Sequence, residues 1–170
     1  LNETSINKTV SYISEQFKRY GYKVEMQNYK TSETSYTHRN VIARYGSKDN
    51  QRLIVGAHYD VCMDTPGADD NASGVAGLMS IAGAFDALKL RPRRTIVFVG
   101  FSGEEYGLWG SHHYAESPVI PLSKTIAMVN LDMIGRLENR AISVSHSGFV
   151  PELETMIRRS GAELNSRIDV

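Results

Sequence analysis

The chain has 170 residues, of which 41% are hydrophobic and 22% are charged, as in ordinary globular proteins. Lys plus Arg and Asp plus Glu are balanced at 19 each, so no excess of charge favours nucleic acid or an anionic membrane as a partner. The longest apolar run, residues 95–101, is far shorter than the ~20 residues of a membrane span. This length suits a single domain over residues 1–170.

Hydrophobic periodicity and the placement of Gly and Pro predict a regular succession of helices and strands. In chain order these are a helix at 4–20, strands at 22–29, 40–45 and 53–57, a helix at 71–88, a strand at 95–101, a short helix at 108–115, strands at 125–131 and 141–144, and a helix at 151–160. The runs 95–101 and 125–131 are continuously apolar, as in strands buried on both faces. The last helix is expected to begin near Pro151 and to end before Gly161.

Strands separated by helices predict an α/β domain. We expect a mixed, mostly parallel central sheet with helices on both faces. The strands 40–45 and 53–57 flank a turn at 46–50. A paired hairpin early in the chain argues against an all-parallel sheet.

Four polar clusters stand at or near the ends of these strands. They are His58-Tyr59-Asp60, Gly67-Ala68-Asp69-Asp70-Asn71-Ala72-Ser73-Gly74, Gly103-Glu104-Glu105 and Asn130-Leu131-Asp132. Three of them directly follow a predicted buried strand, and the fourth begins the helix after the first of these strands. Ligands of open α/β sheets bind beyond the carboxyl ends of the strands, so these clusters are expected to share one crevice.

Such a gathering of carboxylates favours a bound cation, because without one the like charges would repel or protonate. One histidine with Asp and Glu side chains is a ligand set that Zn²⁺ accepts. Two metal ions bridged by a carboxylate would suit hydrolysis. Each cluster alone has an ordinary explanation, such as a hydrogen-bonded histidine, a helix cap or a solvated loop. Their common position at strand ends favours the metal site.

The motifs resemble those of the co-catalytic zinc aminopeptidases of the bacterial leucyl-aminopeptidase type. The wider family includes glutamate carboxypeptidases and glutaminyl cyclases. The resemblance runs from about residue 4 to the end of the chain, and the matching stretches are 55–60, 66–74, 101–108 with Gly110-Ser111, and 130–135.

This resemblance implies a site for two zinc ions in the intact family. Asp70 would bridge both ions, His58 and Asp132 would complete the protein ligands of one, and Glu105 would bind the other. The family also suggests a cis peptide bond between Asp70 and Asn71.

Two further residues gain catalytic roles from the resemblance. Glu104 would be the general base that deprotonates the bridging water and passes the proton to the leaving amine. Asp60 would lie behind His58 and fix its tautomer.

The family has a second histidine ligand in a loop near its C-terminus, and we expect this chain to lack that segment. The chain would then hold one zinc ion or none instead of two. The remaining histidines are expected to be structural or solvated, with His146 the least unsuitable substitute ligand: His38, His112, His113 and His146. Cys62 is interpreted as a small residue beside the pocket.

The resemblance implies a metal-dependent exopeptidase, an aminopeptidase that removes N-terminal residues from peptides. Neither nucleic acid nor membrane insertion is expected, and the family suggests a secreted or periplasmic location. One alternative is a glutaminyl-cyclase-like enzyme with a single zinc ion. The other is an inactive family member that acts in binding, against which the presence of Glu104 argues.

Overall fold

The computed structural model describes residues 3–46, 51–136, 141–145 and 151–169. Contacts within the chain divide it into two compact units, Leu1–Met133 and Ile134–Val170, and each is described by itself. All six candidate site residues lie in the first unit.

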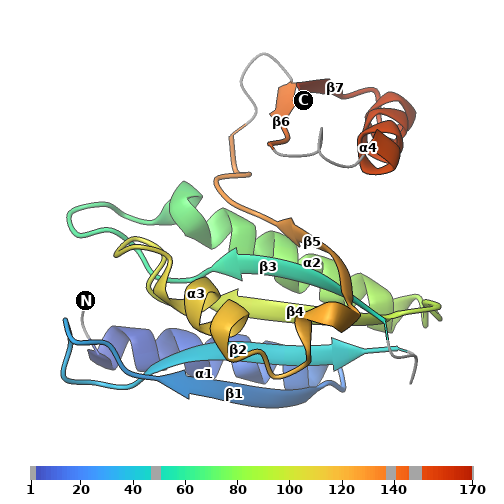
Figure 1. Cartoon of the computed structure of the whole chain (residues 1–170). Helices are drawn as coiled ribbons and strands as arrows, with labels where there is room; N and C mark the ends of the chain where they lie inside the picture. Colours follow the sequence, from blue (N-terminus) through green and yellow to red (C-terminus); the bar gives the residue numbers. More distant parts are fainter. Residues whose placement is uncertain (1–2, 47–50, 137–140, 146–150, 170) are drawn as a thin grey trace. The chain divides into compact units, whose positions relative to one another are not determined.

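A mixed five-stranded sheet forms the centre of the first unit (Figure 1). Its strands, in spatial order, are β1 (Lys23–Tyr29), β2 (His38–Tyr45), β4 (Thr95–Phe101), β3 (Arg52–His58) and β5 (Thr125–Asn130). Strand β2 pairs antiparallel with β1 and β4, whereas β3 pairs parallel with β4 and β5. Four of the five strands therefore run in one direction, which confirms the predicted mixed, mostly parallel sheet.

The early antiparallel hairpin consists of β1 and β2. The hairpin expected from the strands 40–45 and 53–57 is wrong, because β4 lies between β2 and β3. Of the turn predicted at 46–50, residues 47–50 lie outside the described part of the chain.

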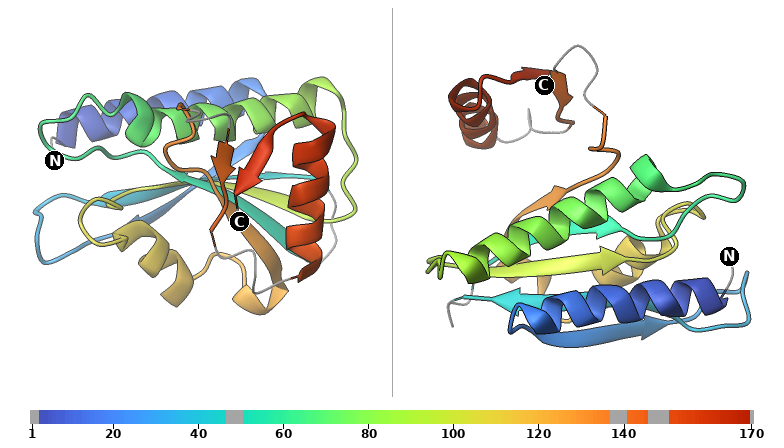
Figure 2. Two further views of the ribbon diagram at one scale, coloured as in Figure 1. Left: turned by 90° about the horizontal axis from the view of Figure 1, so that it is seen from above. Right: turned by 180° about the vertical axis from the view of Figure 1, so that it is seen from behind.

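Helices cover both faces of this sheet (Figure 2). Helices α1 (Glu3–Arg19) and α2 (Gly74–Ala87) lie on one face, and α3 (Trp109–Glu116) lies on the other. A turn of π-helix, η1 (Ala68–Ser73), leads into α2, and a 3₁₀ turn, η2 (Leu122–Lys124), leads into β5.

Two apolar clusters hold these layers together. Phe17, Leu78 and Phe98 belong to the cluster under α1 and α2, and Val97 and Tyr114 belong to the cluster under α3. Full burial of a side chain such as Phe17 or Leu78 contributes about 1.5–3 kcal/mol. Strand β4 is buried at all seven of its positions, as predicted from its continuous apolar run.

Strand β5 contradicts the prediction that it is buried. Ile126, Met128 and Val129 are each close to half exposed. Among the described strands β5 lies at the edge of the sheet, next to β3 alone. An apolar run indicates that a strand favours burial, but burial also requires neighbouring elements, which the run does not reveal.

The second unit contains a small sheet of β6 (Ala141–Ser143) and β7 (Arg167–Asp169), paired in parallel, and the helix α4 (Pro151–Glu163). The predicted end of α4 before Gly161 is wrong, since the helix continues to Glu163. Gly161 is needed for packing, because a Cβ atom there would lie 2.3 Å from Cγ1 of Ile168. Across both units, no described helix is both long and apolar enough to cross a membrane.

Candidate metal centre

The candidate site is built at the carboxyl ends of three neighbouring parallel strands. His58 is the last residue of β3, Glu104 and Glu105 follow β4, and Asp132 follows β5. Because β3 lies between β4 and β5, these residues meet at one edge of the sheet. Asp70 reaches the same edge from η1, at the start of α2.

The imidazole of His58 is the centre of this group. Its Nε2 lies 3.0 Å from Oδ1 of Asp70, 3.5 Å from Oδ1 of Asp132 and 3.9 Å from Oε2 of Glu104. His58 is only 2% exposed, whereas the three carboxylates are each about one third exposed. The structure therefore brings four of the six predicted site residues together around one buried nitrogen atom.

Three of these residues form a group of suitable dimensions for one metal ion. The ligand atoms of His58, Asp70 and Asp132 all lie within 4.8 Å of one another. Nε2 of His58 and Oδ1 of Asp70 are buried, and neither makes a hydrogen bond to any described residue. Buried polar atoms without a partner are costly, and a cation would satisfy both atoms at once. One nitrogen and two carboxylate oxygens fit a zinc site.

Asp60 fixes the orientation of the His58 ring. Nδ1 of His58 lies 3.2 Å from the main-chain oxygen of Asp60 and 3.6 Å from its Oδ1. A proton on Nδ1 directs Nε2 toward the carboxylates, as in other metal-binding histidines. The role of Asp60 in fixing the tautomer of His58 stays a prediction.

The surrounding carboxylates strongly favour positive charge on His58. Burial lowers the pKa of His58, but the hydrogen bond with Asp60 and the charges of Asp132 and Glu104 outweigh it and raise the pKa to about 9. A proton or a metal ion can supply that positive charge.

Asp60 also fixes the loop that follows β4. Its carboxylate, 3% exposed as a residue, accepts the main-chain N–H of Glu104 at 3.1 Å and that of Glu105 at 3.2 Å. Asp60 therefore connects the end of β3 to both glutamates, a function that the sequence did not indicate.

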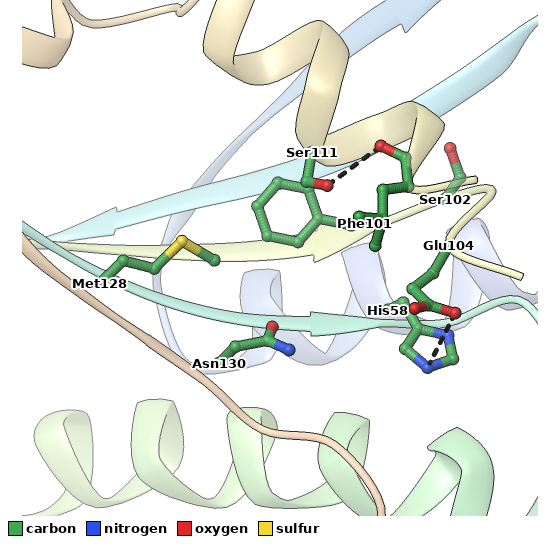
Figure 3. Close-up of a pocket in the computed structure, with 8 residues that line it drawn as sticks. His58, Phe101, Ser102, Glu104, Ser111, Met128 and Asn130 are labelled. Carbon is green, nitrogen blue, oxygen red and sulfur yellow. Dashed lines mark hydrogen bonds and ion pairs between the residues drawn. The ribbon is translucent and has the colours of Figure 1, made fainter. Parts of the chain in front are cut away.

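Glu104 and Glu105 point to different partners. The carboxylate of Glu104 faces His58 (Figure 3). Its pKa is raised by burial and by the charges of Asp132, Glu105 and Asp60, against the opposing effect of His58. The carboxylate of Glu105 instead accepts the main-chain N–H of Cys62 at 2.9 Å, and Glu105 is not part of the three-residue group. Its role as a ligand of a second zinc ion stays a prediction.

Gly103 turns the chain sharply just before Glu104. It has a φ of +72°, a left-handed conformation that favours glycine. A Cβ atom at this position would lie 2.9 Å from Cε3 of Trp109 and 3.3 Å from the hydroxyl of Tyr29. Ser102, which precedes Gly103, is fully buried. The hydroxyl of Tyr29 on β1 donates to the main-chain oxygen of Ser102, and Oδ1 of Asn40 on β2 accepts its main-chain N–H. These bonds hold the base of the glutamate loop.

A cavity of about 130 Å³ lies beside His58 and Glu104 (Figure 3). Its apolar lining comes from Phe101, Leu108 and Met128. Polar atoms are supplied by Ser102, Ser111 and Asn130.

The residues after Asp70 contain one functional position that the sequence did not single out. Asn71 is 2% exposed, and its side chain bonds the segment that carries Asp132. An asparagine directly after a candidate ligand at the start of a helix was the available signal. The peptide bond between Asp70 and Asn71 is cis, as the family resemblance suggested.

The other histidines stand apart from this group as far as they are described. His38 is fully buried among the rings of Tyr29, Tyr36 and Trp109, which fits the predicted structural role. His112 is exposed as predicted, but His113 is partly buried and stacks on Tyr29 with ring centroids 4.9 Å apart. His146, the proposed substitute ligand, lies outside the described residues. Cys62 is exposed and contacts the site through its main chain.

Together, the fold and the site are those of an α/β protein that presents one nitrogen and two carboxylate oxygens, suited to a divalent metal, at the carboxyl edge of its sheet. The profile of peptidase family M28 matches residues 40–169, and the chain belongs to this family. A probable zinc metalloprotease from Pyrenophora tritici-repentis is 41% identical over 99 residues, which cover 53% of this chain and 22% of that protein. The nitrogen and two carboxylate oxygens of His58, Asp70 and Asp132 are a ligand set that such a zinc ion accepts.

Two solved structures share the fold. A Zn-dependent exopeptidase from Parabacteroides distasonis matches with a TM-score of 0.77 and 22% identity, over 94% of this chain and 66% of that one. A glutaminyl cyclase from Porphyromonas gingivalis matches with a TM-score of 0.78 and 22% identity, over 94% of this chain and 65% of that one. The chain spans between 21% and 43% of the length of the first curated relatives that it matches.

Proposed function

We propose that this chain carries the zinc site of an aminopeptidase, which removes N-terminal residues from peptides. The observation that supports this most directly is the buried Nε2 of His58, which faces the carboxylates of Asp70, Asp132 and Glu104 at 3.0–3.9 Å. Three of these four residues form a group that could hold a metal ion, and the fourth, Glu104, lies beside them.

His58, Asp70 and Asp132 would hold one zinc ion in this arrangement. Asp70 is about 39% exposed at its side chain, so it can also face a second ion. Glu105 would contribute a ligand to that second position. The family resemblance supports this assignment, in which the described residues form one three-ligand group and Glu105 stands outside it.

When bound, zinc lowers the pKa of a coordinated water molecule toward ~7 and polarises the substrate carbonyl. Glu104 accepts the proton of the attacking water and delivers it to the leaving amine. Its raised pKa suits both steps, since the carboxylate must gain and then lose a proton near neutral pH. Asp60 holds Glu104 in place through the main-chain N–H bond.

A glutaminyl-cyclase-like activity is the second candidate. The solved cyclase from Porphyromonas gingivalis shares the fold, and the described residues contain one group of three ligands, which suits a single zinc ion. The Asp-Asp-Asn-Ala-Ser-Gly and Asn-Leu-Asp-Met-Ile-Gly motifs support the aminopeptidase instead.

The two candidates differ in their substrates. The zinc-loaded protein should be assayed with an aminoacyl anilide and with a peptide that begins with glutamine. Hydrolysis of the anilide supports the aminopeptidase, whereas cyclisation of glutamine without hydrolysis supports the cyclase. No reaction with either substrate in a zinc-loaded protein would favour a binding function.

Glu104→Gln tests the mechanism. This variant keeps the size of the side chain but cannot accept the proton, so we expect activity to fall by about 100-fold or more. Glu15→Gln, on the exposed side of α1, is the matched control and should stay at the wild-type level. Unchanged activity in Glu104→Gln would contradict the mechanism.

A further inference from the structure

The side chain of Asn71 joins the two segments that carry Asp70 and Asp132. Its Nδ2 donates a hydrogen bond to the main-chain oxygen of Leu131 at 3.0 Å, and its Oδ1 accepts the N–H of Met133 at 3.2 Å. These two partners are the residues on either side of Asp132. The buried amide group of Asn71 therefore holds the main chain on both sides of Asp132, one candidate zinc ligand. Asn71 is also the residue directly after Asp70, another candidate zinc ligand.

These bonds act where the sheet no longer supports the chain. The N–H of Leu131 donates to the carbonyl of Gly56 at 2.8 Å, which is the last main-chain bond between this segment and β3 in the described structure. Met133, two residues later, has a φ of +49°, a left-handed conformation that a methionine adopts at an energetic cost. Asn71 provides bonds on both sides of Asp132, just before this turn, so the direction of the Asp132 carboxylate depends on it.

Helix capping alone does not explain these contacts. Oδ1 of Asn71 also accepts the N–H of Gly74 at 2.9 Å, a bond typical of a residue at a helix N-terminus. A cap requires only that acceptor, and the bonds to Leu131 and Met133 are additional. The chain also keeps space for them, since a Cβ atom on Gly74 would lie 2.3 Å from both Oδ1 of Asn71 and the oxygen of Leu131.

We propose that Asn71 is a positioning residue of the zinc centre, which sets the place of the Asp132 carboxylate relative to Asp70. Asn71 touches neither zinc nor substrate in this role. The inference rests on the zinc site proposed above and is independent of the reaction that the site performs. Substitutions at Asn71 should therefore lower zinc affinity more than they lower the stability of the metal-free fold.

Asn71→Ser separates positioning from capping. Serine is a good helix cap, but its side chain is too short to hold the main chain on both sides of Asp132. We expect zinc affinity, measured by calorimetry on the metal-free protein, to fall by about 10- to 100-fold. The melting temperature without metal should change little, while the rise in melting temperature on adding zinc should shrink. Asn28→Ser, the same substitution on an exposed position of β1, is the control and should leave both quantities unchanged.

Gly74→Ala tests the same contacts while Asn71 remains in place. The added methyl group would push the asparagine amide away from Leu131, so zinc affinity should again fall. Wild-type zinc affinity in either folded variant would overturn the proposal, as would equal losses of melting temperature with and without zinc. A wild-type protein that binds zinc but hydrolyses no peptide would refute the aminopeptidase and leave this result intact.

Discussion

Nε2 of His58 lies 3.0 Å from Oδ1 of Asp70, and both atoms are buried without a hydrogen-bond partner in the described structure. The two residues come from different elements, the end of β3 and the turn η1 before α2. Folding brings these two atoms together, and when the His58 ring is neutral neither has a hydrogen-bond donor among the described residues. A divalent cation satisfies both, which makes the folding of this edge of the sheet and the binding of zinc mutually dependent.

Zinc should therefore stabilise the folded chain. With free zinc at 1,000 times its dissociation constant, the gain is about 4 kcal/mol, or roughly 10 °C in melting temperature for a chain of this size. Calorimetric melting with zinc and after chelation measures this difference. His58→Ala should abolish it, whereas His112→Ala, at an exposed position of α3, should not. An equal zinc effect in the His58 variant would contradict the proposed site.

The two metal positions should differ in affinity in this chain. His58, Asp70 and Asp132 provide three protein ligands for one ion, while Glu105 is bonded to the main chain of Cys62 and stands outside that group. Titration of metal-free protein should show one ion binding appreciably more tightly than the other. Two equal tight sites would contradict this expectation.

Much of this site could be predicted because its residues stand at strand ends. A buried strand is visible as an apolar run, and parallel neighbours bring their carboxyl ends to one edge, so His58, Glu104 and Asp132 could be grouped before any coordinates. Asp70 was expected at the same edge because its cluster begins the helix after the first of these strands, and the resemblance then implied its bridging role. The structure places these four side chains together.

Features that depend on contacts between residues far apart in the sequence could not be predicted. The exposure of β5 depends on which elements lie beside it, and its sequence resembles that of the buried β4. Gly161 looked like a helix stop, but it is required by the packing of Ile168. The role of Asn71 requires knowing that Leu131, 60 positions later in the chain, returns to the same turn.

Asp60 should support catalysis through the loop of the two glutamates. In Asp60→Asn, the side chain keeps one oxygen acceptor and loses the charge that holds both N–H groups and the His58 ring. We expect both zinc affinity and kcat to fall by about 10- to 100-fold. Calorimetry and steady-state kinetics on the same protein measure these, with Asp86→Asn on α2 as a control away from the site. A loss of folding stability with unchanged zinc affinity and kcat would assign Asp60 a purely structural role.

Zinc binding should release a proton from His58 near neutral pH. The raised pKa, about 9 against an ordinary 6.5, means that the metal-free folded chain carries the protonated ring between these values, while the unfolded chain does not. Its contribution to stability without metal is therefore complete below pH 6.5 and is lost as the pH rises through 9. Zinc requires the neutral ring, so its apparent affinity should rise with pH up to about 9. Calorimetric titrations at pH 7.5 in two buffers of different ionisation enthalpy should show about one proton released per tightly bound zinc ion. Heats that do not depend on the buffer would show that His58 is already neutral in the metal-free protein.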